Sequence, residues 1–351
     1  MDYIDVRQSI TNIVAKEKPV VDISDLLFKH KCYYLLGLSS LAPEQRNKLD
    51  MMLAINEINI KTNYLCLENI FKIIANEHYA IVKGAVFSKA AYFKPNMRVS
   101  LDIDLMIHPS YISRIKDVFL GNGFTQGQIK GGEVVPYQRK ETVFYTTNSH
   151  QLAPFVAPTG NQLCPFVNVD LNFNIIWGES KRPIDMDFVL SELKDEVIYG
   201  QTIKKLSPEM EFIHLCLHHY KDLNSIYLIS KGSIRLSLFC DIFFYVIHTN
   251  FNIPKMLFIS EKLEVSRYIY YCLFYCGEIF SHTKLDELIS FYEFSADDNL
   301  INSYGLHESE RKKWVFSFFD RLFWEDFPRK FIETLNDYER EKINLNYKFG
   351  K

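Results

Sequence analysis

The strongest constraint on the fold is a strand-rich segment, residues 79–178, that lies between two regions with helical patterns. Three short apolar runs in this segment are separated by clusters of Gly, Pro and Asn: YAIVKG (79–84), LDIDLMI (101–107) and FVNVDLNFNI (166–175). Such interrupted runs are typical of strands and turns. Residues 111–124 predict a helix that ends at two glycines, and residues 130–150 predict a hairpin. The pattern predicts an α+β fold, with a small mixed-sheet core flanked by N-terminal and C-terminal helical regions.

The helical regions on either side set the predicted domain boundaries. Residues 49–77 contain no glycine and carry apolar side chains at helical spacing. In the second helical region, Ser207 has the properties of an N-cap, and Pro208 suits the first helical position. We expect an N-terminal helical region (1–77), an α/β core (78–182) and a C-terminal helical domain (183–351).

The composition is that of a globular protein and excludes several classes. The 351 residues are 48% apolar and 24% charged, with a net charge of −3, which excludes disordered, collagen-like and coiled-coil chains. The near-neutral charge predicts no broad surface for nucleic acid. We expect no membrane span and no signal peptide. Seven cysteines without a CxxC pair disfavour a disulfide or zinc scaffold, so we expect a cytoplasmic protein.

Two of the predicted strands carry carboxylates on one face. Side chains alternate between the two faces of a strand. In the second run Asp102 and Asp104 share a face, while Leu101 and the other apolar residues take the opposite one. In the third run Asp170 and Asn172 likewise share a face. If the two strands are neighbours, three carboxylates meet on one patch.

A patch of three carboxylates favours a bound cation. Like charges repel unless a cation neutralises them, and oxygen ligands suit a hard ion such as Mg²⁺. Two ions held by shared aspartates can clamp the attacking and leaving oxygens of a phosphoryl displacement. The alternative is two ordinary amphipathic strands with solvated polar faces.

A phosphate site is predicted beside this patch. The first run ends at Lys83-Gly84, and a helix is expected to follow at once, over residues 85–92. A glycine at such a turn lets backbone N–H groups approach a ligand, and a helix N-terminus favours an anion. Lys83 and Arg98 are basic residues that could contact phosphate, although a solvated surface position is the alternative for each.

These residues, in this order and spacing, resemble the nucleotidyltransferase superfamily of polymerase-β-like fold. A closer resemblance is to a bacterial branch of uncharacterised nucleotidyltransferases, which has a Lys-Gly-Ala turn, an Arg shortly before Asp-Ile-Asp-Leu, and a later strand with a third carboxylate. The matching segments are KGA (83–85), RVSLDIDL (98–105) and VDLNF (169–173), and the resemblance covers about residues 65–245. Ala85 stands where the wider superfamily has Gly or Ser, and Asn172 where the branch usually has His.

The resemblance implies a nucleotidyltransferase that moves an NMP from Mg–NTP, with ATP expected, to an acceptor and releases pyrophosphate. It implies two Mg²⁺ ions, which Mn²⁺ can replace. The implied catalytic residues and metal ligands are Asp102, Asp104 and Asp170. The residues expected to contact the nucleotide are Lys83, Gly84, Ala85, Ser88, Arg98, Ser100 and Lys221.

Several alternatives stay open at this point. The acceptor is unidentified: a hydroxyl, phosphate or amine on a small molecule, a peptide or RNA. A catalytically idle nucleotide-binding or protein-interaction module, or a toxin-type enzyme acting on RNA or protein, would carry similar residues. His150, and the helix face with His214 and His218, either line the site or lie on an ordinary surface. The two helix histidines are four residues apart, so zinc binding is a further alternative for them. The aromatic segment 314–327 predicts core packing or a homodimer interface, with a face for another partner or for a membrane surface as the alternative.

Overall fold

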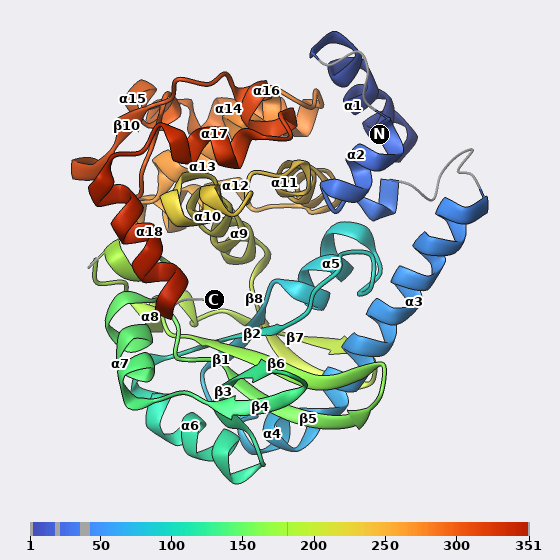
Figure 1. The fold of residues 1–351 in the computed structure, drawn as a ribbon, viewed down its shortest axis with the longest axis vertical. Helices are drawn as coiled ribbons and strands as arrows, with labels where there is room; N and C mark the ends of the chain where they lie inside the picture. The colour runs from blue at the N-terminus through green and yellow to red at the C-terminus, as the bar shows by residue number, and fades with distance from the viewer. Residues whose placement is uncertain (1–2, 18–21, 36–42, 181, 350–351) are drawn as a thin grey trace. The chain divides into compact units, whose positions relative to one another are not determined.

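The computed structural model of the chain describes residues 3–17, 22–35, 43–180 and 182–349 (Figure 1). Contacts divide the chain into two compact units. The sheet unit is Asn47–Glu211, and the helical unit is Met1–Arg46 with Phe212–Lys351. The boundaries expected at residues 77 and 182 come from local sequence patterns, whereas these units come from packing, so those boundaries stay a prediction.

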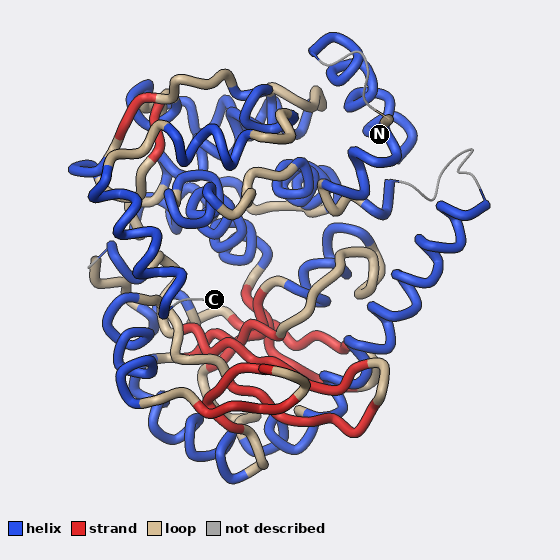
Figure 2. The backbone as a smooth tube through the Cα atoms, in the orientation of Figure 1, coloured by secondary structure: helices blue, strands red, loops and turns tan. Residues whose placement is uncertain are grey.

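The sheet unit contains a six-stranded mixed sheet in the order β1-β2-β6-β5-β3-β4. Figure 2 shows strands in red. Strands β2 and β6 run parallel, and the other neighbouring pairs run antiparallel. This arrangement confirms the predicted α+β fold with a mixed sheet. The strands are β1 (Tyr79–Val82), β2 (Ile103–Ile107), β3 (Thr125–Lys130), β4 (Glu133–Pro136), β5 (Phe155–Asn161) and β6 (Cys164–Asn172). A separate hairpin, β7 (Leu193–Ile198) with β8 (Gln201–Leu206), lies against β1.

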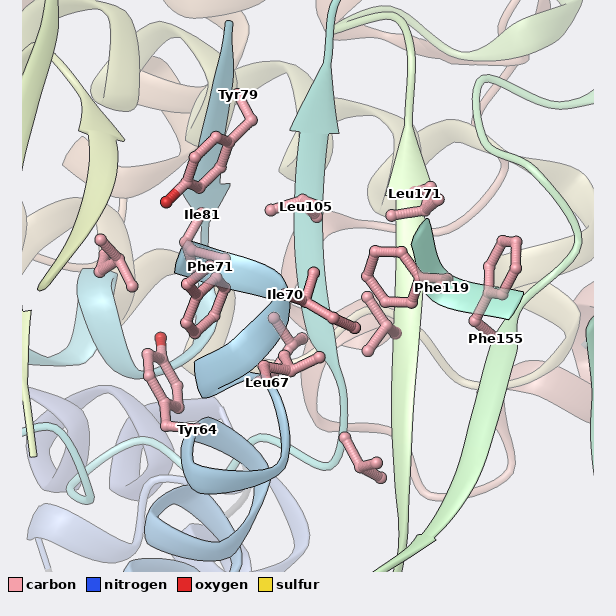
Figure 3. Close-up of a cluster of buried hydrophobic side chains, with 14 of the residues drawn as sticks. Tyr64, Leu67, Ile70, Phe71, Tyr79, Ile81, Leu105, Phe119, Phe155 and Leu171 are labelled. Atoms are coloured by element: carbon pink, nitrogen blue, oxygen red, sulfur yellow. The ribbon is translucent and has the colours of Figure 1, made fainter. Parts of the chain in front are cut away.

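One face of the sheet is packed against helices α4 (Glu68–Ile73) and α6 (Ile112–Gly121). Figure 3 shows side chains of these helices, among them Phe71 and Phe119, together with Leu105 of β2 and Leu171 of β6 in one cluster. Full burial of each such side chain contributes about 1.5–3 kcal/mol. Because side chains alternate along a strand, this apolar face directs the neighbours of Leu105 and Leu171 to the opposite face.

The hairpin predicted over residues 130–150 is only partly correct. β3 and β4 form a hairpin around Gly131 and Gly132, both with positive φ. Helix α7 (Arg139–Asn148) then occupies the second half of the predicted hairpin. The helix begins with a capping box, in which Gln138 N donates to Glu141 Oε2 at 2.6 Å. This local hydrogen bonding outweighs the β-propensity of the Thr, Val and aromatic residues in the segment.

The helical unit packs around helix α11 (Leu236–His248), which is buried over most of its length. Helix α9 (Pro208–Asn224) begins in the sheet unit, where Ser207 Oγ accepts a hydrogen bond from Met210 N at 3.4 Å, as expected for an N-cap. The other elements are α1 (Tyr3–Glu17), α2 (Ile23–Lys29), α10 (Ile226–Ser230), α12 (Ile253–Lys262), α13 (Ser266–Gly277), α14 (Thr283–Tyr292), α15 (Asp298–Ile301), α16 (Phe318–Phe323), α17 (Phe327–Glu333), α18 (Asp337–Phe349) and the pair β9 (Ser303–Tyr304) and β10 (Lys312–Lys313).

The aromatic segment 314–327 contributes to the core of the helical unit. The Trp314 ring lies 4.6 Å from that of Tyr304, and Phe327 is buried. Intramolecular packing therefore accounts for part of this segment, and a homodimer through it stays a prediction. Each of the seven cysteines carries a free thiol. Among the helices in the described ranges, none combines the length and apolarity needed to cross a bilayer.

Candidate functional site

The site begins at a sharp turn between β1 and helix α5 (Gly84–Tyr92). Two consecutive residues have positive φ there: Lys83, at φ 58° and ψ −150°, and Gly84, at φ 49°. A non-glycine residue in this region of backbone space is strained, and such strain concentrates at functional sites. The first N–H groups of a helix have no partner inside it. The turn therefore offers backbone donors to an anion, as the sequence predicts.

Replacement of Gly84 with Ala tests how closely this turn is packed. A Cβ at this position would lie 3.3 Å from Ser100 Oγ, and the alanine would have to keep the positive φ of Gly84. We expect Gly84→Ala to lower the free energy of unfolding by about 1–2 kcal/mol, as measured by chemical denaturation. Gly121→Ala is the matched control, because a Cβ there meets nothing within 4 Å. Equal unfolding midpoints for the two variants would contradict a tight turn.

Two buried polar side chains hold the loop that connects α5 to β2. Ser88 is fully buried, and its hydroxyl donates to Lys94 O at 2.7 Å and accepts from Arg98 N at 3.0 Å. Asn56, on helix α3 (Pro43–Cys66), donates to Asn96 O at 2.8 Å and also bonds Arg98 O. The sequence predicts that Ser88 contacts phosphate. We assign its hydroxyl to the loop instead, because burial and these two bonds occupy it.

The register of β2 and β6 brings carboxylates together. Asp104 and Asp170 are direct partners in this parallel pair, so their side chains leave the same face of strands about 4.8 Å apart. Asp170 is only 5% exposed and Asn172 only 2%, which does not fit the alternative of solvated polar faces. Asp102 precedes β2 by one residue. Leu101 was expected on the buried face but is 73% exposed, because the strand starts after it.

Asp104 is bound by a cation and an amide. Lys83 Nζ lies 3.1 Å from Asp104 Oδ1, and the two side chains are 13% and 11% exposed. Asn172 Nδ2 donates to the same oxygen at 3.1 Å. The ammonium group, expected on a phosphate, is here the counter-ion of the carboxylate. The turn, β2 and β6 therefore converge on one oxygen atom.

The side-chain atoms near Asp104 are of the kind that bind a hard divalent cation. All the candidate ligands are oxygens. The Asp104 carboxylate is paired with the Lys83 ammonium group, which a metal ion would have to displace. Asn172 Oδ1 is buried and lacks a hydrogen-bond donor among the described residues, so a further oxygen is free for a cation. Within the described ranges, however, no three His, Cys, Asp or Glu side chains are grouped closely enough to hold a metal.

The other residues that the sequence predicts for the site have contacts of their own. Ser100 is near the turn, and its hydroxyl donates to Asp102 O at 3.0 Å. Ala85 is buried in the first turn of α5. The Arg98 guanidinium lies 5.8 Å from the Phe87 ring centre. The carbonyl of His150 accepts from Phe173 N at 2.9 Å, just after β6.

Three predicted residues lie on the part of α9 that belongs to the helical unit: His214, His218 and Lys221. His214 is buried, which does not fit a solvated face at that position. His218 Nε2 lies 3.5 Å from Asp222 Oδ2. No described trio of zinc-type ligands includes these histidines. A phosphate contact by Lys221 stays a prediction.

Sequence reasoning did not predict the contacts of two amides that organise the site, Asn56 and Asn172. Asn56 interrupts an apolar helical run, and a polar residue inside such a run is a signal of a buried hydrogen-bonding role. Asn172 lies on the same strand face as Asp170, which places it near the carboxylates. Its partner Asp104 lies on another strand, so no local pattern could have identified the contact.

A comparison with protein families identifies one match over most of the chain. Residues 27–281 match the model of a family described as uncharacterised nucleotidyltransferase. A crystal structure of an antigenic nucleotidyltransferase-like protein from Paracoccidioides brasiliensis is similar at 18% identity, covering 63% of this chain and 92% of that one, with a TM-score of 0.32. No curated protein matches the sequence.

Proposed function

Because this chain belongs to the family of uncharacterised nucleotidyltransferases, we propose that it is a metal-dependent enzyme that transfers an NMP from Mg–NTP to an acceptor. ATP is the nucleotide that we expect. One observation carries the metal-dependent chemistry: Asp104 and Asp170 are in register on neighbouring parallel strands, next to a glycine turn. The acceptor group is a hydroxyl, phosphate or amine of a small molecule, a peptide or RNA. A cytoplasmic location and a homodimer through residues 314–327 belong to the same proposal.

The three carboxylates have different tasks in this proposal. Asp102 and Asp104 would hold the Mg²⁺ that arrives with the triphosphate, and Asp170 would complete the site of a second ion. When bound, these ions would neutralise charge on the triphosphate and polarise the α-phosphate. Mn²⁺ has similar ligand preferences and could serve in place of Mg²⁺. The uncoordinated Asn172 Oδ1 supports the presence of a cation on this face.

The reaction is an in-line substitution at the α-phosphorus. The acceptor oxygen or nitrogen forms a bond to phosphorus, and the bond from phosphorus to the bridging oxygen of pyrophosphate breaks. Asp170 accepts the proton of an acceptor hydroxyl as this bond forms. The N–H groups of Gly84 and Ala85, together with Lys83, Arg98 and Ser100, orient the triphosphate.

Nucleotide binding requires a rearrangement around Asp104. The pocket beside Asp102 and Asp104 has a volume of only about 10 Å³, which is the space of about one water molecule. Lys83 Nζ lies on the carboxylate that would bind the metal. We infer that Lys83 exchanges Asp104 for a phosphate oxygen when Mg–NTP binds, which keeps its charge compensated in both states.

The requirement for metal is the direct test of the proposal. In this proposal Asp102, Asp104 and Asp170 would repel a triphosphate unless cations neutralise them. We therefore expect a non-hydrolysable ATP analogue to bind at least about tenfold more tightly with Mg²⁺ than with EDTA, as measured by isothermal titration calorimetry. Asp117→Asn, which removes one exposed carboxylate from α6, should behave like the wild type. Equal affinity in EDTA would contradict the two-ion proposal and favour an idle binding module.

A further inference from the structure

A second cavity lies wholly within the helical unit and is independent of the carboxylate site. It has a volume of about 510 Å³ and is formed by α2, α16 and α17 and by residues 232–235, before α11. This volume is in the range of sites for small molecules. Apolar walls are supplied by Leu322, Phe323 and Phe327, all buried.

The buried polar groups that line this cavity are donors rather than carboxylates. Arg321 is only 6% exposed. Its Nη2 donates to Tyr275 Oη at 2.9 Å, its Nε to Ser317 O at 3.3 Å, and its guanidinium lies 4.3 Å from the Trp314 ring centre. Among the described residues, no carboxylate lies within ion-pair distance of it. A buried charge without an ionic partner is costly, so an anion in this cavity would be stabilised.

Arg235 adds a second guanidinium to the lining of the cavity. It is half-buried, and its Nε donates to Gly232 O at 3.2 Å. No described carboxylate forms an ion pair with it. Two planar guanidinium groups with free N–H donors can bind one carboxylate or phosphate with short, charge-assisted hydrogen bonds.

His30 adds a neutral polar side chain to the lining of the cavity. It is 5% exposed, and its Nδ1 accepts a hydrogen bond from Leu236 N at 2.9 Å. Burial, together with the positive charges of Lys29 and Arg235, lowers the pKa of His30 to about 4. The ring is therefore neutral at pH 7, and because Nδ1 is an acceptor, Nε2 carries the proton. His30 therefore contributes no charge to the lining of the cavity.

The carboxylates of this cavity lie at its rim. Asp22, Asp25 and Glu325 line it and are all exposed. Glu325 pairs with Lys29 at 3.1 Å, and Asp22 Oδ1 caps α2 by accepting from Ser24 N at 2.7 Å. Solvent screens exposed charges of this kind strongly. The interior of the cavity is therefore electropositive even though its lining contains acidic residues.

We propose that this cavity binds a small organic anion, with its carboxylate or phosphate group on Arg235 and Arg321 and its apolar body against Phe323 and Phe327. The ligand is an aromatic or aliphatic monoanion or phosphate monoester small enough for the cavity. Both anionic groups fit a guanidinium fork, so probes of each kind are needed to distinguish them.

The experiment is isothermal titration calorimetry of the full chain with phenyl phosphate, benzoate and the neutral isostere benzamide. We expect at least one anion to bind, and benzamide to bind at least about tenfold more weakly, because it lacks the charge. The anion that binds identifies the group. Arg235→Gln should weaken that anion by at least about tenfold, and it removes only one hydrogen bond to the backbone.

Two further variants separate this cavity from other positive charges. Arg329→Gln removes an exposed guanidinium from α17, paired with Asp326 at 2.8 Å, and should leave anion binding unchanged. Lys83→Gln should also leave it unchanged, which separates the cavity from the carboxylate site. The absence of anion binding, equal binding of benzamide, or an unchanged affinity in Arg235→Gln would each overturn the proposal.

Discussion

We expect the variants Asp102→Asn and Asp104→Asn to lose nucleotidyl transfer alike and to differ in stability. Both would lose a ligand of the ion that accompanies the triphosphate. Such an ion supplies several kcal/mol of transition-state stabilisation, so the rate of transfer should fall by about 10³-fold or more. Release of pyrophosphate from ATP, with a suitable acceptor present, measures this loss.

The difference in stability follows from the contacts of Asp104. Its carboxylate compensates Lys83 in a pair that is only 13% and 11% exposed. Asp104→Asn leaves that ammonium without a full counter-charge, and we expect a loss of about 1–3 kcal/mol in the free energy of unfolding. Asp102→Asn should change stability less, because it relieves repulsion among the carboxylates.

The double variant Lys83→Met with Asp104→Asn provides the control for this interpretation. It removes both charges, so the additional loss from the uncompensated ammonium should disappear in a double-mutant cycle. Strict additivity of the two single changes would show that the pair at 3.1 Å does not stabilise the fold. Equal transfer rates in Asp102→Asn and the wild type would instead contradict the assignment of the metal ligands.

Asp170→Asn should separate binding of the nucleotide from chemistry. Asp170 lies on β6 rather than on β2, and we assign it to the second ion and to the proton of the acceptor. The affinity for Mg–NTP should therefore stay within a few-fold of the wild type. Turnover at saturating nucleotide should fall by about 10²-fold or more, which is typical of losing a positioned base.

Calorimetry with a non-hydrolysable analogue and single-turnover kinetics measure these two quantities separately. Asp102→Asn is the comparison, because it should weaken Mg–NTP binding itself. The division of tasks among the carboxylates is wrong if Asp170→Asn loses nucleotide binding and keeps its turnover at saturation.

Much of the fold and the identity of the candidate residues could be predicted because they depend on local geometry. The alternation of LDIDLMI and VNVDLNFNI specifies which side chains share a strand face, and Val169, Leu171 and Leu105 are indeed buried. The helix after Gly84 follows from residues close in sequence. At α7, the hydrogen bonds of the capping box compete with β-propensity, and the strand predicted there from propensity is wrong.

What could not be predicted depends on pairing between distant segments. Asp104 meets Asp170 because β2 and β6 pair in one register out of several that keep the apolar face inward. Lys83 reaches Asp104, which is 21 positions later in the sequence, because the strained turn directs the lysine side chain onto that carboxylate. Ser88 bonds the loop because that loop folds back onto α5.

The sequence by itself determined that Asp104 and Asp170 lie on polar strand faces, with Asp102 just before the first of these strands and a glycine turn close by in the chain, because strand periodicity and turn chemistry act over a few residues. Only the tertiary structure decided that Asp104 is compensated by Lys83 and Asn172, and that Arg321 is buried without a carboxylate partner among the described residues. Both results depend on long-range packing, because the residues that contact a charged side chain come from distant parts of the chain and not from its neighbours in sequence.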